Sequence, residues 1–189
     1  YTRAPDVFFE RILNRDDNTL TQVTDIASVS EGQPTGANSF FYLDKDKIEN
    51  WAIEDKYLKP SLKSPKDSDR IRFAKDELKK WKLVIEEGEE ISNNLSEYLS
   101  WGKKEGYKKD YFSEPWYSKK AKVVPLAVGR GIWRQHITFY NRYDDVVASD
   151  RFSEIELKNN DGTADKVVCA FLNSTVGNLV VELSGRTNL

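Results

Sequence analysis

The sequence predicts an α+β fold in which short, mostly antiparallel strands lie between N-terminal and C-terminal helices. Apolar residues have helical spacing near both ends, and short β-prone segments separated by turn residues fill the region between. The chain has 189 residues, 39% of them hydrophobic, and shows no internal repeat. It is therefore long enough to bury a core, and we expect a single domain over residues 1–189.

The N-terminal half is expected to alternate helices and strands. Pro5 suits the first turn of a helix, and Pro60 and Pro65 interrupt any regular element around them. The expected elements are helices over 5–14, 46–51 and 93–105, strands over 20–29, 40–43 and 80–85, and a structured loop over 55–72.

The C-terminal half is expected to continue as strands and to end in helices. Strands are predicted over 121–128, 135–140, 145–148 and 152–157. Residues 164–184 have helical spacing, which Asn173-Ser174-Thr175 interrupts. These three polar residues are suited to capping a second helix.

A glycine-punctuated loop stands out between two predicted strands. Gly32 and Gly36 flank Pro34, and the aromatic residues from Phe40 onward anchor the segment to a core. Glycine lets a backbone turn sharply and approach a partner closely. Thr35 and Asn38 add small hydrogen-bonding groups, so the loop is a candidate binding element as well as a candidate structural turn.

Charge is distributed unevenly along the chain, although the net charge is only −2. Residues 55–82 hold ten Lys and Arg against five Asp and Glu, and residues 101–134 hold nine against three. Residues 83–100, between them, carry five glutamates and no cation. Two basic blocks are able to form one basic face, whereas alternating solvated faces would explain the same pattern.

Several common chemistries are excluded. One histidine, His136, and one cysteine, Cys169, do not make a zinc site, and no phosphate-binding loop or nucleophile elbow occurs. We expect His136 on a strand near the surface and Cys169 buried as a small apolar residue. The chain lacks a signal peptide and a membrane-length apolar run, so a cytoplasmic location with no membrane partner is expected.

One enzymatic alternative stays open from the residues. Glu77-Leu78-Lys79, Glu156-Leu157-Lys158 and Glu54-Asp55-Lys56 have the Glu-x-Lys form of metal-dependent nucleases. Asp67 or Asp150 would supply a second carboxylate for Mg²⁺. This interpretation predicts a small Mg²⁺-dependent restriction nuclease.

Short motifs in a particular order resemble the C-terminal target-recognition domain of adenine-N6 DNA methyltransferases of restriction–modification systems. The motifs begin with Tyr1-Thr2-Arg3-Ala4-Pro5-Asp6 and cover nearly the whole chain. The others include Thr35-Gly36-Ala37-Asn38-Ser39-Phe40-Phe41-Tyr42-Leu43, Tyr57-Leu58-Lys59-Pro60-Ser61-Leu62, Phe171-Leu172-Asn173-Ser174-Thr175 and Glu182-Leu183-Ser184-Gly185-Arg186-Thr187-Asn188-Leu189. More loosely, the glycine loop resembles the recognition domains of type I specificity subunits, so half of such a subunit is a second alternative.

The resemblance implies that DNA recognition and catalysis lie in separate domains. In such enzymes a separate N-terminal domain binds S-adenosylmethionine and carries an Asn-Pro-Pro-Tyr motif for the flipped adenine, and this chain has neither feature. The chain starts at Tyr1 and contains no methionine, so we expect a fragment of a longer methyltransferase with its catalytic domain upstream. The expected partners are double-stranded DNA and that catalytic domain.

Chemistry selects the candidate DNA-binding residues. Lys, Arg, hydroxyls and backbone N–H groups contact phosphates, whereas Arg, Asn, Gln and Lys read bases. Arg130 and its neighbours lie at the turn between two predicted strands, where the competing role is an ion pair with Asp144 or Asp145. Trp116 and Tyr117 are candidates for base stacking or for the core. The predicted DNA-binding set is Thr35, Gly36, Asn38, Lys59, Lys63, Lys66, Arg130, Arg134, Gln135, Asn141 and Arg142.

Overall fold

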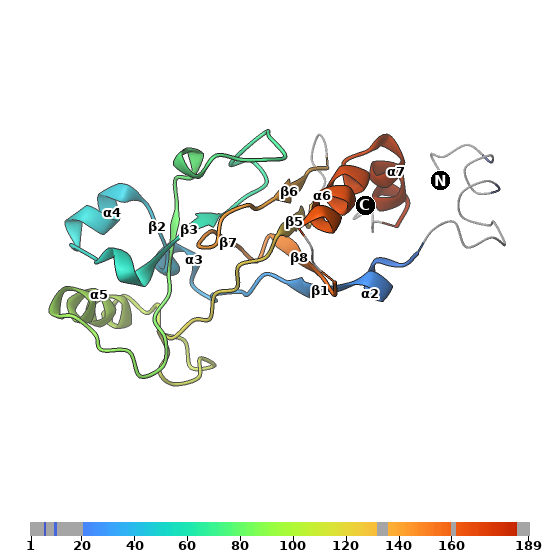
Figure 1. The fold of residues 1–189 in the computed structure, drawn as a ribbon. Helices are drawn as coiled ribbons and strands as arrows, with labels where there is room; N and C mark the ends of the chain where they lie inside the picture. The colour runs from blue at the N-terminus through green and yellow to red at the C-terminus, as the bar shows by residue number, and fades with distance from the viewer. Residues whose placement is uncertain (1–5, 7–9, 11–20, 132–135, 160–161, 185–189) are drawn as a thin grey trace.

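Two four-stranded sheets form the centre of the protein (Figure 1). The computed structural model describes residues 6, 10, 21–131, 136–159 and 162–184. The first sheet has the order β1-β8-β5-β6 and is antiparallel throughout, with β1 Ala27–Glu31, β8 Phe152–Leu157, β5 Leu126–Gly129 and β6 Thr138–Tyr140. The second has the order β2-β4-β3-β7, with β2 Tyr42–Leu43, β4 Trp81–Leu83, β3 Leu58–Leu62 and β7 Val147–Ala148.

One of the connections between the sheets is a short turn. Strand β7 pairs in parallel with β3 in the second sheet, and residues 149–151 then lead into β8 of the first. Backbone hydrogen bonds fix this turn, because Ser149 N donates to Leu62 O at 3.1 Å and Phe152 N to Ser149 O at 3.1 Å. The turn therefore fixes the position of one sheet relative to the other at this point.

Helices lie at both ends of the molecule (Figure 1). Helices α4 and α5 lie at one end, and α6 and α7 lie at the other. The helices are α2 Val23–Ile26, α3 Asn38–Phe41, α4 Lys45–Asn50, α5 Asn93–Lys104, α6 Thr163–Leu172 and α7 Thr175–Ser184, with short 3-10 turns at Asp55–Tyr57 and Lys75–Glu77. The predicted α+β class, with mostly antiparallel strands and terminal helices, is confirmed. None of the helices in the described ranges is long and apolar enough to cross a bilayer.

Elements with clear periodicity and caps were predicted well. The strand over 152–157 is β8, the helix over 93–105 is α5, and the helical run over 164–184 divides into α6 and α7 at Asn173. Ser92 caps α5, since its hydroxyl accepts a hydrogen bond from Leu95 N at 3.3 Å. The helix predicted over 5–14 lies, except for residues 6 and 10, outside the described residues.

Three predicted elements were wrong in part. Phe40 and Phe41 lie in α3 rather than in a strand, because both of their N–H groups donate to Ala37 O. Residues 23–26 of the predicted strand 20–29 form α2. The predicted loop 55–72 contains β3, where Pro60 pairs with Trp81, and the pairing of β3 with β7 begins only at Ser61. Proline is tolerated where no partner strand needs its missing N–H.

The remaining strands are shorter than predicted. In the residues that the structure describes, four predicted strands pair over β5, β6, β7 and β4 alone. These strands were predicted over 121–128, 135–140, 145–148 and 80–85. His136, which was expected on a strand near the surface, is buried and precedes β6. Cys169 is buried as predicted, and burial raises the pKa of its thiol to about 11.

The largest core cluster is aromatic and joins the glycine loop to α5. The Phe40 ring stacks on Tyr98 with centroids 4.6 Å apart, and both side chains are fully buried. Gly102 is required beside them, because a Cβ there would lie 2.1 Å from the Phe40 ring. The Tyr98 hydroxyl donates to Phe40 O at 2.7 Å, which satisfies a buried carbonyl at the end of the loop.

Replacing Tyr98 with phenylalanine is expected to destabilise the protein by about 1–2 kcal/mol, because Phe40 O loses its side-chain donor in a buried site. Chemical denaturation followed by circular dichroism measures the change. Tyr111→Phe is the matched control, since Tyr111 is 75% exposed, and it should leave stability unaltered. Equal stability of the two variants would contradict a stabilising role for the Tyr98 hydroxyl.

Candidate nucleic-acid interface

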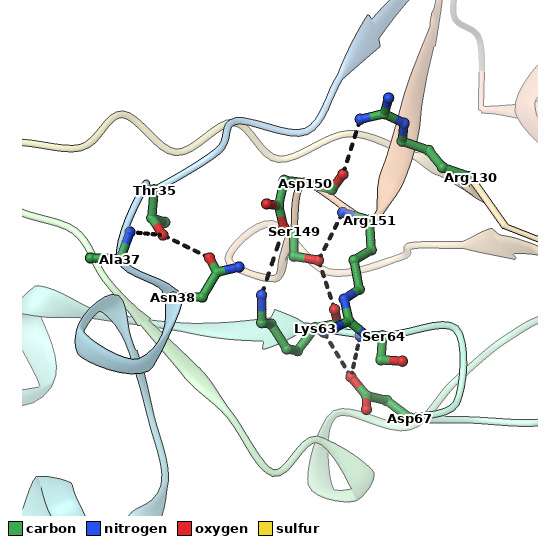
Figure 2. Close-up of polar contacts among 10 residues, drawn as sticks. All are labelled: Thr35, Ala37, Asn38, Lys63, Ser64, Asp67, Arg130, Ser149, Asp150 and Arg151. Carbon is green, nitrogen blue, oxygen red and sulfur yellow. Dashed lines mark hydrogen bonds and ion pairs between the residues drawn. The ribbon is translucent and has the colours of Figure 1, made fainter. Parts of the chain in front are cut away.

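Four segments that are distant in sequence meet at the β7–β8 turn (Figure 2). They are the glycine loop over 32–38, the loop over 63–67 after β3, Arg130 at the end of β5, and the turn over 149–151. The predicted DNA-binding residues in these segments are Thr35, Gly36, Asn38, Lys63, Lys66 and Arg130. We call these four segments together the convergent surface.

The glycine loop is internally ordered. The Thr35 hydroxyl donates to Asn38 Oδ1 at 2.7 Å and accepts from Ala37 N at 3.3 Å. Thr35 is 1% exposed, so it shapes the loop from within, whereas Asn38 and Gly36 are exposed. Gly36 has a φ of +70°, which favours glycine. The loop thus presents Asn38 and its own backbone to solvent in a fixed conformation.

Gly32 sets the distance between the glycine loop and the turn. Its N–H donates to Phe152 O at 3.0 Å, and a Cβ at this position would lie 2.1 Å from Ser149 O. Only a residue without a side chain fits this approach of two backbones. The glycine predicted from the sequence as a close-approach position therefore approaches another part of the same chain.

The loop after β3 is held by side-chain oxygens. Asp67 Oδ2 accepts from Lys63 N at 2.7 Å and from Ser64 N at 2.8 Å. From the other side, the Ser149 hydroxyl donates to Lys63 O at 2.7 Å and accepts from Arg151 N at 3.2 Å. These bonds fix the backbone of Lys63 on both sides, and they position its side chain.

Lys63 is a partly buried cation with a long ion pair. Its Nζ lies 3.7 Å from Asp150 Oδ1 and 3.9 Å from the centre of the Tyr42 ring, and the side chain is 17% exposed. Burial lowers the pKa of the Lys63 ammonium, and the Asp150 carboxylate opposes that shift. A separation of 3.7 Å is longer than a hydrogen bond, so the ammonium can still gain from a closer anion.

Arg130 is held in a fixed direction by Glu31. Its two terminal nitrogens lie 3.0 Å and 3.2 Å from the two carboxylate oxygens of Glu31, and Nη1 also donates to Asp150 O at 3.3 Å. The Arg130 side chain remains 44% exposed. The competing role of Arg130 was an ion pair with Asp144 or Asp145. Arg130 does make an ion pair, but its partner is Glu31, and Asp145 pairs with Lys75.

The remaining predicted residues lie outside the convergent surface, line a separate groove or have structural contacts. Lys59 lies in β3, and its cross-strand partner is the buried Lys82. Lys66 lies in the loop over 63–67 of the convergent surface, and it lines a shallow groove with Arg70 and Lys79. The Asn141 amide donates to Val124 O and Val146 O and accepts from Tyr143 N, which is a structural role.

Arg142 donates to the Tyr143 hydroxyl at 3.1 Å and lies over the same ring. That hydrogen bond lowers the pKa of Tyr143. Arg134 and Gln135 lie outside the described residues. Trp116 is buried in the aromatic core, as expected of most aromatic side chains, and Tyr117 packs against that core.

Sequence reasoning did not assign a DNA-binding role to Glu31, Ser149, Asp150 or Arg151. Their positions become informative only in the fold, because each lies beside a segment that is far away in sequence. The one signal in the sequence was the short Ala148-Ser149-Asp150-Arg151 segment between two predicted strands, which is typical of a tight turn.

Two glutamates of the nuclease alternative make ordinary ion pairs. Glu77 lies 3.3 Å from Arg70, and Glu156 pairs with Lys122. In the part of the chain that the structure describes, no three His, Cys, Asp or Glu side chains are grouped to hold a metal ion. The geometry therefore gives these glutamates surface ion-pair roles.

Comparison with known proteins identifies relatives of the chain. A family model described as the C-terminal domain of type II methyltransferase M.Eco57I matches residues 8–188. Type II methyltransferase M.AccI of Acinetobacter calcoaceticus is 27% identical over 119 residues, which cover 58% of this chain and 22% of that protein.

A solved structure shares the fold. The type IIG restriction endonuclease BpuSI superposes with a TM-score of 0.66 over 92% of this chain, at 16% identity, and the match covers 22% of that chain. The chain thus spans about a fifth of the length of both relatives. Because the family model covers nearly all of its residues, the chain belongs to the family of C-terminal domains of type II methyltransferases represented by M.Eco57I.

Proposed function

We propose that this chain is the DNA target-recognition domain of a restriction–modification methyltransferase. In this proposal it positions duplex DNA for adenine-N6 methylation by a separate catalytic domain of the same cytoplasmic parent protein. The observation that carries the proposal is the convergent surface, where a rigid glycine loop lies beside the cations Lys63 and Arg130 (Figure 2). Ordered loops carrying cations and amides suit contacts with phosphates and base edges.

Lys63 is suited to a backbone phosphate. Its ammonium is partly desolvated, and its ion pair with Asp150 is 3.7 Å long. A phosphate oxygen at hydrogen-bonding distance would replace this weak partner with a charge-assisted hydrogen bond. The fixed backbone on either side of Lys63 means that little conformational entropy is lost when the contact forms.

Arg130 is suited to bidentate recognition, either of a guanine edge or of a phosphate. The guanidinium already binds the two oxygens of Glu31 in a fork, so its donors are aligned for a planar acceptor. DNA would have to displace Glu31 from these donors. Glu31 is 67% exposed, so its carboxylate can be rehydrated when DNA takes its place.

S-adenosylmethionine is assigned to the remainder of the parent protein. The chain has no Asn-Pro-Pro-Tyr motif and no cofactor fingerprint, so its residues do not fit that cofactor. The contribution of this chain is binding and orientation of the duplex, and we propose no chemical step for it.

Fluorescence-anisotropy titration with a mixed-sequence duplex at two salt concentrations tests the proposal. Wild-type affinity is expected to fall steeply with salt, because bound phosphates release counterions. Lys63→Met keeps the apolar stem over Tyr42 but removes the charge, and we expect about 5- to 10-fold weaker binding with a salt slope smaller by roughly 0.9. Arg130→Ala should weaken binding by about 1–3 kcal/mol.

Lys45→Ala is the matched control, because Lys45 is 78% exposed on α4 and pairs with Glu49 in the same helix. It removes one positive charge and should leave affinity within about twofold, since exposed pairs contribute little. Glu31→Gln should strengthen binding by releasing Arg130. Failure of the wild-type chain to bind even at low salt, or equal losses in Lys45→Ala and Lys63→Met, would refute the proposal.

A further inference from the structure

Tyr111 is an aromatic side chain with an unusually large exposed surface. It is 75% exposed, whereas the other exposed large apolar residues of the described chain range from 39% to 62%. It lies in a basic segment, because residues 101–122 contain seven lysines and three carboxylates. An exposed aromatic ring among lysines is the combination that binds unpaired bases by stacking.

The position of Tyr111 connects it to the convergent surface. A Cβ on Gly36 would lie 3.4 Å from the Tyr111 hydroxyl and 2.5 Å from the Phe112 ring. The ring of Tyr111 therefore lies beside the glycine loop, next to the residues that hold Asn38 in place. The surface around Tyr111 therefore adjoins the convergent surface at the glycine loop.

The Tyr111 ring contacts a side chain that is itself packed against the core. Its ring packs edge-on against Phe112 with centroids 5.0 Å apart, and Phe112 packs against the aromatic core. Lys119 Nζ lies 4.1 Å from the centre of the Phe112 ring. A rigid aromatic side chain loses little entropy when it binds, which favours its use as an anchor.

The surrounding lysines are suited to the phosphates that flank a stacked base. Lys109 Nζ donates to Gly106 O at 2.8 Å, and Lys108 pairs with Glu114, so both stems are directed by local contacts. Burial lowers the pKa of Lys119, whose charge lies over the Phe112 and Phe41 rings. Such cations lie within reach of an anion that approaches Tyr111.

We propose that Tyr111 stacks on a nucleobase at an opened step of the bound duplex, and that Lys108, Lys109 and Lys119 hold the adjacent phosphates. An intact duplex hides the faces of its bases, so a protruding ring gains a stacking partner only where a base leaves the stack. The inference rests on the proposed function and adds to it a base-stacking site, beside the glycine loop, that favours distorted DNA.

The test compares two duplexes of mixed sequence, identical except that one contains a mismatched base pair, which is easier to unstack. Wild-type protein is expected to prefer the mismatched duplex. Tyr111→Ala should bind the mismatched duplex about 5- to 150-fold more weakly and lose the preference for it. Tyr111→Phe and Tyr111→Trp should keep both the affinity and the preference for the mismatched duplex, because stacking requires the ring and not the hydroxyl. The salt slope of Tyr111→Ala should equal that of the wild type, since no phosphate contact is removed.

Phe171→Ala is the matched control, because Phe171 is 43% exposed on α6, at the opposite end of the molecule from α5 and the segment that follows it (Figure 1). Its affinity should equal that of the wild type. Unchanged binding by Tyr111→Ala, or an equal loss in Tyr111→Phe, would overturn the stacking site while leaving DNA recognition intact. Absence of wild-type binding would instead refute the proposed function, and the stacking site with it.

Discussion

Replacing Phe40 with alanine is expected to destabilise the protein by about 3–5 kcal/mol. Phe40 is fully buried and lies at the centre of the aromatic core. The five rings with centroids 4.6–6.3 Å from its own belong to Phe41, Tyr98, Trp101, Tyr107 and Trp116. Alanine removes the central ring and leaves a cavity that the rigid neighbours cannot fill. This loss is a large part of the roughly 5–15 kcal/mol that stabilises a typical domain.

Urea denaturation followed by circular dichroism measures the effect, and Phe171→Ala is its control. Both changes delete the same atoms, but Phe171 is 43% exposed, so we expect the control to lose less than about 1 kcal/mol. The Phe40 variant should also bind DNA less well, because Phe40 lies in α3 directly after the glycine loop. Similar stability losses in both variants would show that the aromatic cluster is not the main core.

Replacing Gly32 with alanine is expected to separate the glycine loop from the β7–β8 turn. The new Cβ would lie 2.1 Å from Ser149 O, which belongs to a backbone that cannot rotate away. Relief by moving the loop would break the hydrogen bond from Gly32 N to Phe152 O. We expect a stability loss of about 1–3 kcal/mol from this overpacking. We also expect about 10-fold weaker DNA binding, because the loop would move relative to Lys63 and Arg130.

Gly88→Ala is the control that separates the effect of the steric clash from the effect of replacing a glycine. Gly88 has a φ of +85°, and among the described residues no heavy atom lies within 4 Å of the place that a Cβ would take. Its variant therefore gains a methyl group and backbone strain without a clash. Thermal unfolding should show a loss of about 1 kcal/mol, and anisotropy should show unaltered DNA affinity. Wild-type DNA affinity in Gly32→Ala would contradict the requirement for a close approach of loop and turn.

Local sequence signals predicted those elements whose stability is also local. The alternation over β8, the Ser92 cap of α5 and the polar break between α6 and α7 all act within a few residues, and each was located correctly. The strand predicted at Phe40 was wrong, since aromatic residues suit any buried position and tertiary packing placed these rings on a helical turn. The proline at position 60 was taken to interrupt an element, yet it lies in β3.

The sequence by itself determined the α+β class, the glycine loop, the basic blocks and the resemblance to a methyltransferase recognition domain. Tertiary structure alone decided which cations meet and what holds them. Arg130 and Glu31 are 99 residues apart in sequence, and Ser149 and Lys63 are 86 apart, so no local pattern encodes either contact. Both contacts arise because antiparallel pairing of β1 and β5 with β8, and parallel pairing of β3 with β7, bring the ends of distant strands to one turn.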